Sequence, residues 1–365
     1  MINTDKLWMV DAHCDSLWMR DFLNDAINLN KSKFTLTTET RDFFKKTMKF
    51  EFPEGYSCPY HINLSRLKKG NVKVLFMNLG DYDLLQSSRL IDAAYQLTQS
   101  NDFSICKNYS EVTHAIKNNK FAIIISAEGP CIFNGQIDLL RNWHRLGLTM
   151  VSVTHGEGTH GLPENPKRYF GKKSVEMAKN ALQISTSLEK HMSESNRHKL
   201  YRKEEGLTLF GKQVIKEMTK LNMICDLSHA NDASFWQVLE SDVKVCVTHS
   251  NCFSVCNHTR NLTDDMMKAL TERNGVMGIC FYGDYIDSNN PTLDKYADHI
   301  LHALSVMGEN HVGIGSDYDG VPPDAFMAIK QPGFMNKLWE KLIQRGLSEK
   351  ILLKIAHENF LKLMK

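Results

Sequence analysis

The chain has 365 residues, enough to bury a large hydrophobic core, and 42% of them are hydrophobic and 24% charged, as in ordinary globular proteins. Its 44 basic and 42 acidic residues give a formal net charge of +2 and are spread along the sequence. Without a long basic block, neither a nucleic acid nor an anionic membrane is indicated as a partner.

The N-terminal residues are polar and lead into an apolar stretch that is too short for a secretory signal. No run of about 18 apolar residues is present, so no membrane span is expected. The nine cysteines are scattered and form no Cys-x-x-Cys pair. They are expected to be reduced thiols of a cytoplasmic protein, and Cys225, Cys246 and Cys280 are expected to act as small hydrophobic residues inside strands.

Eight short apolar runs recur along the chain and predict eight strands. In chain order they are Leu7–Val10, Val72–Leu79, Phe121–Ser126, Thr149–Thr154, Met223–Leu227, Val243–Thr248, Val276–Phe281 and Val312–Gly315.

Amphipathic segments lie between most of these runs and predict helices. The spacing predicts helices over Leu90–Gln99 and over Ile137–Leu146, which closes on Gly147. Further helices are expected to begin after Thr208, to begin at Thr263 and end near Gly275, and to run from Leu293 to Gly308.

Strands that alternate with helices indicate βαβ units and a parallel sheet. Eight units predict a closed (β/α)₈ TIM-type barrel of the metal-dependent hydrolase class, a fold of about 250 residues. A doubly wound open sheet is the alternative. The remaining residues are expected as insertions near 20–70 and 156–206 of a single domain over 1–365. The second insertion contains the charged segment Glu189–Glu205, which is typical of a solvated helix or a lid.

Histidine and acidic residues follow most of the predicted strands. His13 and Asp15 follow the first strand two residues apart, a spacing that puts both side chains on one side of an extended strand. Active sites of such barrels form at the carboxyl ends of the strands, so side chains from different strands are expected to meet there. The others are Glu128 after the third strand, His155 after the fourth, His229 after the fifth, His249 after the sixth and Asp317 after the eighth.

Imidazoles and carboxylates are the usual ligands of Zn²⁺. One catalytic zinc takes three protein ligands and a water, so His13, Asp15, Glu128, His229 and His249 exceed what one ion needs. With one bridging carboxylate they suit two ions about 3.5–4 Å apart. A single histidine at a strand end is more often a hydrogen-bonded surface residue, so the prediction depends on the whole set. His160 competes with His155 for its place.

Several longer motifs also occur in a characteristic order: Asp11-Ala-His-Cys-Asp15, Ala127-Glu-Gly129, Val153-Thr-His155, Asp226-Leu-Ser-His229, Thr248-His-Ser-Asn251, Arg260-Asn-Leu262, Gly315-Ser-Asp-Tyr-Asp-Gly320 and Asn359-Phe-Leu361. In these motifs the chain resembles the membrane (renal) dipeptidase family of zinc metallopeptidases, including its bacterial cytoplasmic members. The resemblance covers nearly the whole chain.

The resemblance implies a role for each matching residue. Two zinc ions per chain are expected, with His13 and Asp15 on one, His229 and His249 on the other, and Glu128 bridging them. The substrate residues are implied in the same way: His155 contacts the substrate and stabilises the oxyanion, Arg260 pairs with a substrate carboxylate, and Asp317 is the general acid and base.

The resemblance also implies the reaction. The expected partners are small dipeptides, hydrolysed by a zinc-bridged hydroxide with broad tolerance of side chains and, in some members, of a D-residue at the C-terminal position. Some members also open β-lactam rings. Many barrels form homodimers, and the sequence leaves this open, together with the natural dipeptide and the metal used in the cell.

Two other functions remain as alternatives. Other amidohydrolase-type barrels act on lactones, phosphotriesters or cyclic amides, but usually carry His-x-His and a bridging lysine, where this chain has His13-x-Asp15 and Glu128. A metal-binding barrel without catalysis would not need Arg260 and Asp317. The chain departs from the family pattern after His155, where many relatives have an asparagine-containing stretch, so the resemblance does not define the substrate range.

Overall fold

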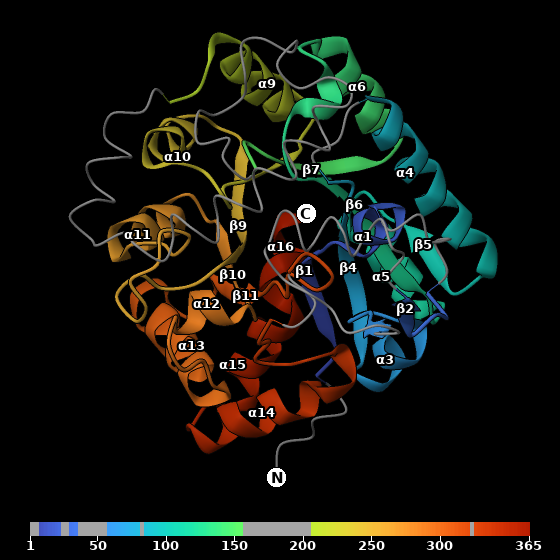
Figure 1. Cartoon of the computed structure of the whole chain (residues 1–365). Helices are drawn as coiled ribbons and strands as arrows, with labels where there is room; N and C mark the ends of the chain where they lie inside the picture. Colours follow the sequence, from blue (N-terminus) through green and yellow to red (C-terminus); the bar gives the residue numbers. More distant parts are fainter. Residues whose placement is uncertain (1–6, 23–28, 36–56, 81–83, 156–205, 322–324) are drawn as a thin grey trace.

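The computed structural model describes residues 7–22, 29–35, 57–80, 84–155, 206–321 and 325–365. Eight parallel strands form a nearly closed barrel, and helices surround it (Figure 1). The barrel strands are β1 (Met9–Cys14), β4 (Val72–Asn78), β6 (Phe121–Ala127), β7 (Leu148–Ser152), β8 (Ile224–Asp226), β9 (Lys244–Ser250), β10 (Val276–Ile279) and β11 (Val312–Ile314).

The strand order follows the chain, β1-β4-β6-β7-β8-β9-β10-β11, and every neighbouring pair is parallel. The first and last strands meet through a parallel bridge between Cys14 and Tyr318. Beside it, the backbone N–H of Ser316 donates to Asp11 Oδ1 at 2.8 Å, and the Ser316 hydroxyl donates to Asp11 Oδ2 at 2.6 Å. These contacts close the ring, so the barrel prediction is confirmed over the open doubly wound sheet.

Most of the helices cover the outside of the ring of strands (Figure 1). Thr208 and Thr263 cap their helices as predicted, because each hydroxyl accepts the backbone N–H three residues later. The helix predicted over Leu90–Gln99 begins six residues earlier, at Leu84. The helices are α1 (Ser16–Phe22), α3 (Leu64–Lys69), α4 (Leu84–Leu97), α5 (Tyr109–Lys117), α6 (Ile137–Arg145), α9 (Leu209–Lys220), α10 (Asp232–Leu239), α11 (Asp264–Glu272), α12 (Gly283–Ile286), α13 (Leu293–Met307), α14 (Met335–Gln344), α15 (Glu349–Leu353) and α16 (Asn359–Leu363).

Three short strands were not predicted. β5 (Phe103–Ile105) pairs in parallel with the first residues of β6, and β2 (Lys33–Thr35) pairs antiparallel with β3 (Ser57–Pro59) within the segment 20–70. Three residues are too few for a hydrophobic period to stand out. Most of the 156–206 insertion, with His160 and the segment Glu189–Glu205, lies outside the described residues.

The interior of the barrel is apolar at the amino ends of the strands. Alternate residues of each strand face inward, such as Val74 and Phe76 of β4 and Ile124 of β6. Phe360 of α16 packs against them, with its ring centroid 6.2 Å from that of Phe76. Helix α16 lies near the centre of the ring in Figure 1, and its apolar side chains fill the amino end of the barrel.

Two of the predicted strands extend at least two residues beyond their predicted ends. β1 and β9 continue to Cys14 and Ser250, so His13 and His249 lie within these strands rather than after them. Both strands have a register shift at this point. Such bulges redirect side chains next to active sites, and here they accompany histidines that face the mouth of the barrel.

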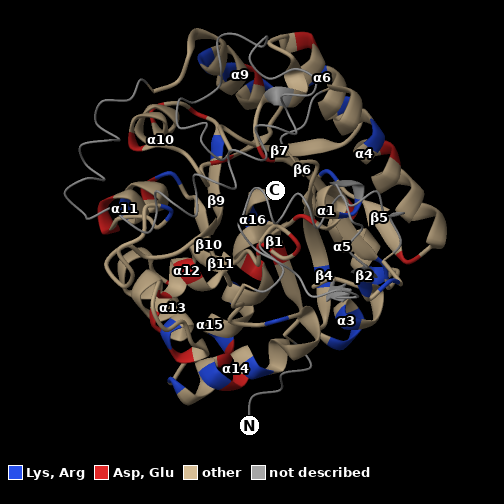
Figure 2. Cartoon of the chain, viewed as in Figure 1, with Lys and Arg blue, Asp and Glu red and all other residues tan. Residues whose placement is uncertain are grey.

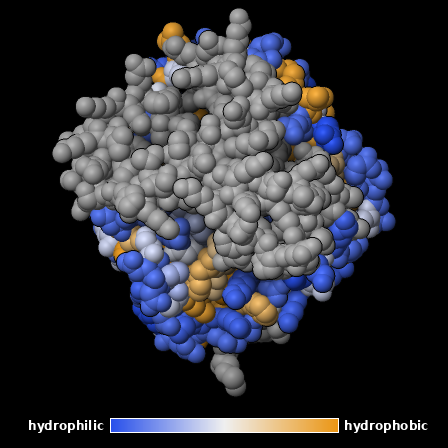
Figure 3. All heavy atoms as spheres, viewed as in Figure 1, coloured by the Kyte–Doolittle hydropathy of each residue, from blue (hydrophilic) through white to orange (hydrophobic). Residues whose placement is uncertain are grey.

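The outer surface mixes both signs of charge. Figure 2 shows Lys and Arg interspersed with Asp and Glu over the outer helices, and Figure 3 shows a largely hydrophilic rim with small hydrophobic areas. Large exposed apolar residues, such as Leu85, Leu209 and Trp236, are scattered. Among the described helices, none combines the length and hydropathy needed to cross a membrane.

Candidate metal centre

The polar side chains predicted from the sequence meet at the carboxyl ends of the barrel strands. Glu128 directly follows β6 and lies at the centre of the cluster. Its Oε1 is 2.9 Å from His229 Nε2 and 3.2 Å from His249 Nε2. Its Oε2 is 3.6 Å from His13 Nε2 and 3.6 Å from His155 Nε2. The two oxygens of one carboxylate therefore face two different sets of histidines.

One side of the cluster is formed by β1. His13 Nε2 lies 3.2 Å from Asp15 Oδ2, and both side chains are almost fully buried. Asn78, at the end of β4, donates from Nδ2 to Asp15 Oδ1 at 2.7 Å and to Glu128 Oε2 at 2.8 Å. The amide thus holds these two carboxylates side by side.

The other side is formed by β8 and β9. His229 follows β8 in a left-handed backbone conformation, with φ 64°, and His249 lies near the end of β9. Their Nε2 atoms are only 3.0 Å apart. Residues held in this conformation without being glycine are uncommon and cluster at functional sites.

Asp317 follows β11 and closes the site from that side. It also has a positive φ, 61°, and its backbone N–H donates to the carbonyl of His13 at 3.1 Å. A Cβ on Gly320 would collide with Asp15 Oδ2 and Asp317 Oδ1, so a larger residue there would displace these carboxylates. The backbone of the β11 loop thus approaches the two carboxylates closely.

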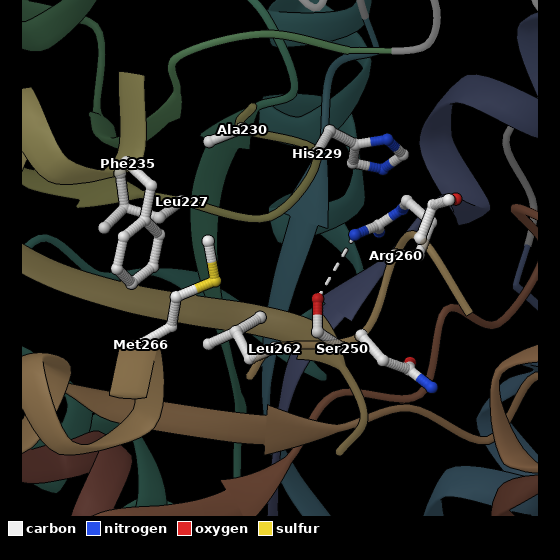
Figure 4. A pocket seen from close by; sticks show the side chains of 10 residues that line it. Leu227, His229, Ala230, Phe235, Ser250, Arg260, Leu262 and Met266 are labelled. Atoms are coloured by element: carbon white, nitrogen blue, oxygen red, sulfur yellow. Dashed lines mark hydrogen bonds between the residues drawn. The ribbon is translucent and has the colours of Figure 1, made fainter. Parts of the chain in front are cut away.

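Arg260, in the loop after β9, lies at the edge of the cluster. Its two terminal nitrogens donate to Ser250 Oγ and to the His249 carbonyl, each at 3.2 Å. Its guanidinium lies 5.2 Å from the ring centre of Tyr285, and it forms no salt bridge with any of the described residues. A cavity of about 30 Å³ adjoins it (Figure 4). Figure 4 shows Arg260 and His229 on one side of this cavity and Leu227, Phe235, Leu262 and Met266 on the other.

Burial and charge set the protonation of the histidines. Desolvation lowers the pKa of His229 to about 3 and that of His249 well below its usual value, so both are neutral. Burial also opposes a charge on His13, but the Glu128 and Asp15 carboxylates outweigh it and raise the pKa of His13 well above the ordinary value. The β1 side of the site therefore attracts positive charge.

The carboxyl groups of Glu128 and Asp317 have pKa values shifted in opposite directions. Burial alone would raise the pKa of Glu128, but the neighbouring His155 and His13 imidazoles hold it well below its usual range. Burial raises the pKa of Asp317 well above the ordinary value, and the nearby charges of Asp15 and Glu128 add to this effect. An added divalent cation would relieve this excess of negative charge.

The donor atoms fit a divalent metal. Three groups of side chains each bring ligand atoms within 4.8 Å of one another. The neutral His229 and His249 present imidazole nitrogens toward an ionised carboxylate, which is the ligand set that Zn²⁺ and related ions take. The groups are His13 with Asp15 and Glu128, Glu128 with His229 and His249, and His13 with Asp226 and His249.

Some residues of the site were not predicted. Asn78 has no signal in the sequence, because an amide at a strand end is not a usual zinc ligand. Asp226 has one, since it is an acidic residue inside an apolar strand. His61 also contributes, because its backbone N–H donates to Asp319 Oδ1 at 2.7 Å, and the Ser16 hydroxyl donates to Asp319 Oδ2 at 2.5 Å. These bonds link the loop after β11 to α1 through Ser16 and to the segment before α3 through His61.

Three cysteines are buried as predicted; Cys225 and Cys246 lie inside strands, and Cys280 directly follows β10. Cys225, Cys246 and Cys280 are buried free thiols. Burial raises the pKa of each well above the ordinary value, so they are protonated and behave as small apolar residues.

The sequence matches the model of a known protein family over nearly its whole length. The family model for membrane dipeptidase, peptidase family M19, matches residues 4–165 and 180–365. The chain belongs to this family. The ligand-type residues of this M19 protein lie at the carboxyl ends of the barrel strands or directly after them.

Curated relatives of this M19 protein are similar at moderate identity. An uncharacterised dipeptidase of Schizosaccharomyces pombe, C965.12, is 28% identical over 75% of the chain, and the chain spans 64% of that protein's length. Dipeptidase verJ of Clonostachys rogersoniana is 28% identical over 83% of the chain and 75% of its own length.

Solved structures share the fold of the M19 protein. The dipeptidase AC, described as a metallopeptidase of family M19, superposes with a TM-score of 0.70 at 21% identity over 98% of both chains. A metallopeptidase of Rhodobacter sphaeroides, liganded with a phosphinate mimic of the dipeptide L-Ala-D-Ala, gives a TM-score of 0.72 at 21% identity over 98% of both chains. The probable dipeptidase PvdM of Pseudomonas aeruginosa gives 0.71 at 15% identity, over 99% of this chain and 95% of its own.

Proposed function

We propose that this M19 protein is a metal-dependent dipeptidase that hydrolyses the peptide bond of small dipeptides. The observation that supports this most is the position of Glu128, whose two carboxylate oxygens face two different sets of ligand-type side chains. A carboxylate placed in this way suits a bridge between two metal ions.

The residues divide into two sets of ligands in this proposal. His13 and Asp15 would hold one zinc ion and His229 and His249 the other, with Glu128 between them. When bound, two zinc ions would make a hydroxide available near neutral pH and would polarise the carbonyl of the peptide bond.

Arg260 would recognise the free carboxylate at the C-terminus of the substrate. Its guanidinium is partly buried and lacks an acidic partner among the described residues, and a planar guanidinium suits a carboxylate. A small cavity lined by Arg260 and His229 lies beside this guanidinium. Recognition of a free carboxylate near the reacting bond would favour short substrates over long chains.

His155 and Asp317 would contribute to the chemical step. His155 lies within 3.6 Å of Glu128 and is partly exposed, so it can donate to the carbonyl oxygen as negative charge develops. Asp317 would take the proton of the attacking water and deliver it to the amine that leaves. The carbon–nitrogen bond breaks as the new carbon–oxygen bond forms, and two amino acids result.

Broad tolerance of side chains is part of the proposal, with a D-residue accepted at the C-terminal position. The related Rhodobacter sphaeroides structure, which holds a mimic of L-Ala-D-Ala, supports including such substrates in the test.

The test is a panel of L,L- and L,D-dipeptides assayed with the purified full chain, before and after chelation and after zinc is restored. We expect hydrolysis that is lost on chelation and recovered with zinc. Matched dipeptide amides, which lack the C-terminal carboxylate, should be hydrolysed at least about tenfold less efficiently. A lactone, a phosphotriester and a β-lactam serve as substrates of the alternative activities.

Activity that survives complete removal of metal would contradict the proposal. Failure on every dipeptide, with turnover of the lactone or phosphotriester, would assign the protein to another hydrolase activity. Equal rates on dipeptides and their amides would remove Arg260 from its proposed role.

A further inference from the structure

Asp226, at the end of β8, is a buried acidic residue that has no place in the proposed reaction. Its exposure is 0%, and it faces the barrel interior one layer below the candidate metal ligands. It belongs to the same motif as His229, but its hydrogen bonds lead to His249 instead. A carboxylate buried in this way needs partners, since an unpaired buried charge is costly.

Five donors surround the Asp226 carboxylate. Oδ1 accepts the backbone N–H groups of Ser228 at 3.0 Å and Thr248 at 2.9 Å, and the Ser228 hydroxyl at 2.9 Å. Oδ2 accepts the hydroxyls of Ser152 at 2.9 Å and Thr248 at 2.7 Å. Strands β7, β8 and β9 are thus linked through one side chain.

The hydroxyl of Thr248 connects this carboxylate to His249. Its Oγ1 lies 2.8 Å from His249 Nδ1. A hydroxyl has one proton to donate. The hydroxyl of Ser228, also within 3.2 Å, already accepts the backbone N–H groups of Thr248 and His249. Two acceptors remain for the Thr248 proton, Asp226 Oδ2 at 2.7 Å and His249 Nδ1 at 2.8 Å. A carboxylate accepts a stronger hydrogen bond than a neutral ring nitrogen, so the proton goes to Asp226 Oδ2.

The direction of these bonds determines the tautomer of His249. Because Thr248 donates to Asp226, its oxygen can only accept from His249 Nδ1, which must carry the ring proton. Nε2 then keeps its lone pair, and it is this atom that lies 3.2 Å from Glu128 Oε1 and 3.0 Å from His229 Nε2. The unprotonated nitrogen points into the candidate metal site.

We propose that Asp226 and Thr248 are positioning residues that hold His249 in its metal-binding tautomer. Asp226 acts through the Thr248 hydroxyl and does not itself bind the metal. Partners of this kind orient metal-binding histidines, and their loss typically weakens metal affinity about 10- to 100-fold. The proposal rests on the proposed metal site but not on the substrate.

The test titrates the chelated full chain with Zn²⁺ in competition with a chelating dye. Thr248→Val removes the hydroxyl and keeps the side-chain shape. We expect it to lower the affinity for one of the two zinc ions about 10- to 100-fold. Thr248→Ser keeps the hydroxyl and should bind zinc as the unchanged protein does. Ser152→Ala is the matched control, because it removes another hydrogen bond to Asp226 but leaves the link to His249.

Asp226→Asn should reverse the tautomer of His249. Its amide can donate to Thr248, whose hydroxyl then donates to His249 Nδ1 and moves the ring proton to Nε2. Long-range proton–nitrogen NMR of the metal-free protein reports this directly. We expect the Nδ1–H form in the unchanged protein and the Nε2–H form in Asp226→Asn.

Three results would overturn the proposal. An unchanged protein with the Nε2–H form would exclude the tautomer argument, whether or not any variant folds. Full affinity for two zinc ions in Thr248→Val would exclude the Thr248 hydroxyl as the link between Asp226 and His249. A loss of zinc in Asp226→Asn alone would make Asp226 a direct ligand. A protein that binds no zinc would remove the proposed function as well, whereas one that binds two zinc ions but hydrolyses no dipeptide leaves this proposal intact.

Discussion

The two ends of the barrel interior are built from the same strands but from opposite kinds of side chain. At the amino ends, inward positions hold residues such as Val74, Ile124 and Ile224, covered by Phe360 of α16. Two to four residues further along the same strands, the inward positions become Asn78, Glu128 and Asp226. The contrast indicates that the amino end stabilises the barrel while the carboxyl end, rich in buried polar groups, is reserved for chemistry.

This division predicts that changes at the two ends have separable effects. Variants at the carboxyl end should lose metal or turnover in a folded protein, and variants at the amino end should lose stability without changing the chemistry of the folded molecules.

The largest effect is expected for Glu128→Gln. The amide keeps the size of the side chain but loses the charge that both sets of ligands share, so the protein should retain less than two zinc ions per chain. Dipeptide hydrolysis should fall by about 10³-fold or more. Metal analysis of the gel-filtered protein, with circular dichroism as the control for folding, checks this. Two retained zinc ions would show that Glu128 is not the bridge.

The next largest effect is expected for Asp317→Asn, which tests whether proton transfer can be lost without loss of metal at the carboxyl ends of the strands. Asp317→Asn should keep both zinc ions and the KM for a dipeptide, while kcat falls by about 10²- to 10⁴-fold because the acid and base is lost. Steady-state kinetics and metal content measured on one preparation distinguish the two. A loss of metal equal to the loss of turnover would make Asp317 a ligand instead.

Phe360→Ala tests the other end of the comparison. Removing this buried ring from between Phe76 and the strand β11 should destabilise the protein by about 3–5 kcal/mol. Urea unfolding measures the loss, and kcat/KM per folded molecule should stay within about twofold of the unchanged protein. A large fall in kcat/KM at full folding would show that the two ends are coupled.

The smallest effect is a pH dependence of stability at the amino end. Burial lowers the pKa of His357, which bonds to the Trp8 carbonyl and stacks on the Trp8 ring, to about 4. The unfolded chain takes up this proton near pH 6.5, so folding free energy is lost as pH falls from about 6.5 to 4. Between pH 7 and 5 the loss should be about 2 kcal/mol.

His357→Asn provides the matched variant for this prediction. Its amide can still donate to the Trp8 carbonyl but does not titrate, so this part of the slope between pH 7 and 5 should disappear. Urea unfolding of both proteins at the two pH values gives the comparison. An equal slope in both would place the titration elsewhere.

Much of this arrangement could be predicted from the sequence, because hydrophobic periods of two residues and of helical spacing reveal the elements, and Thr208, Thr263 and Gly308 reveal helix ends. The convergence of Glu128, His229 and Asp317 followed from the rule that barrel strands present their carboxyl ends at one face. The extensions of β1 and β9 through His13 and His249 could not be predicted, because polar residues end an apolar run even where the strand continues through a bulge.

The hydrogen-bonded partners of the site were harder to predict than the ligand-type residues. Asn78, His61 and Asp226 carry no distinctive spacing, and each gains its meaning from a residue far away in the chain. Such pairings depend on the strand register, which is a property of the folded barrel.

The central claim is that Glu128 bridges two metal ions, and anomalous scattering at the zinc edge from crystals of the zinc-loaded protein tests it most directly. We expect two peaks about 3.5–4 Å apart, one beside His13 and Asp15 and the other beside His229 and His249, with Glu128 in contact with both. A single peak, or two peaks of which Glu128 touches only one, would contradict the account.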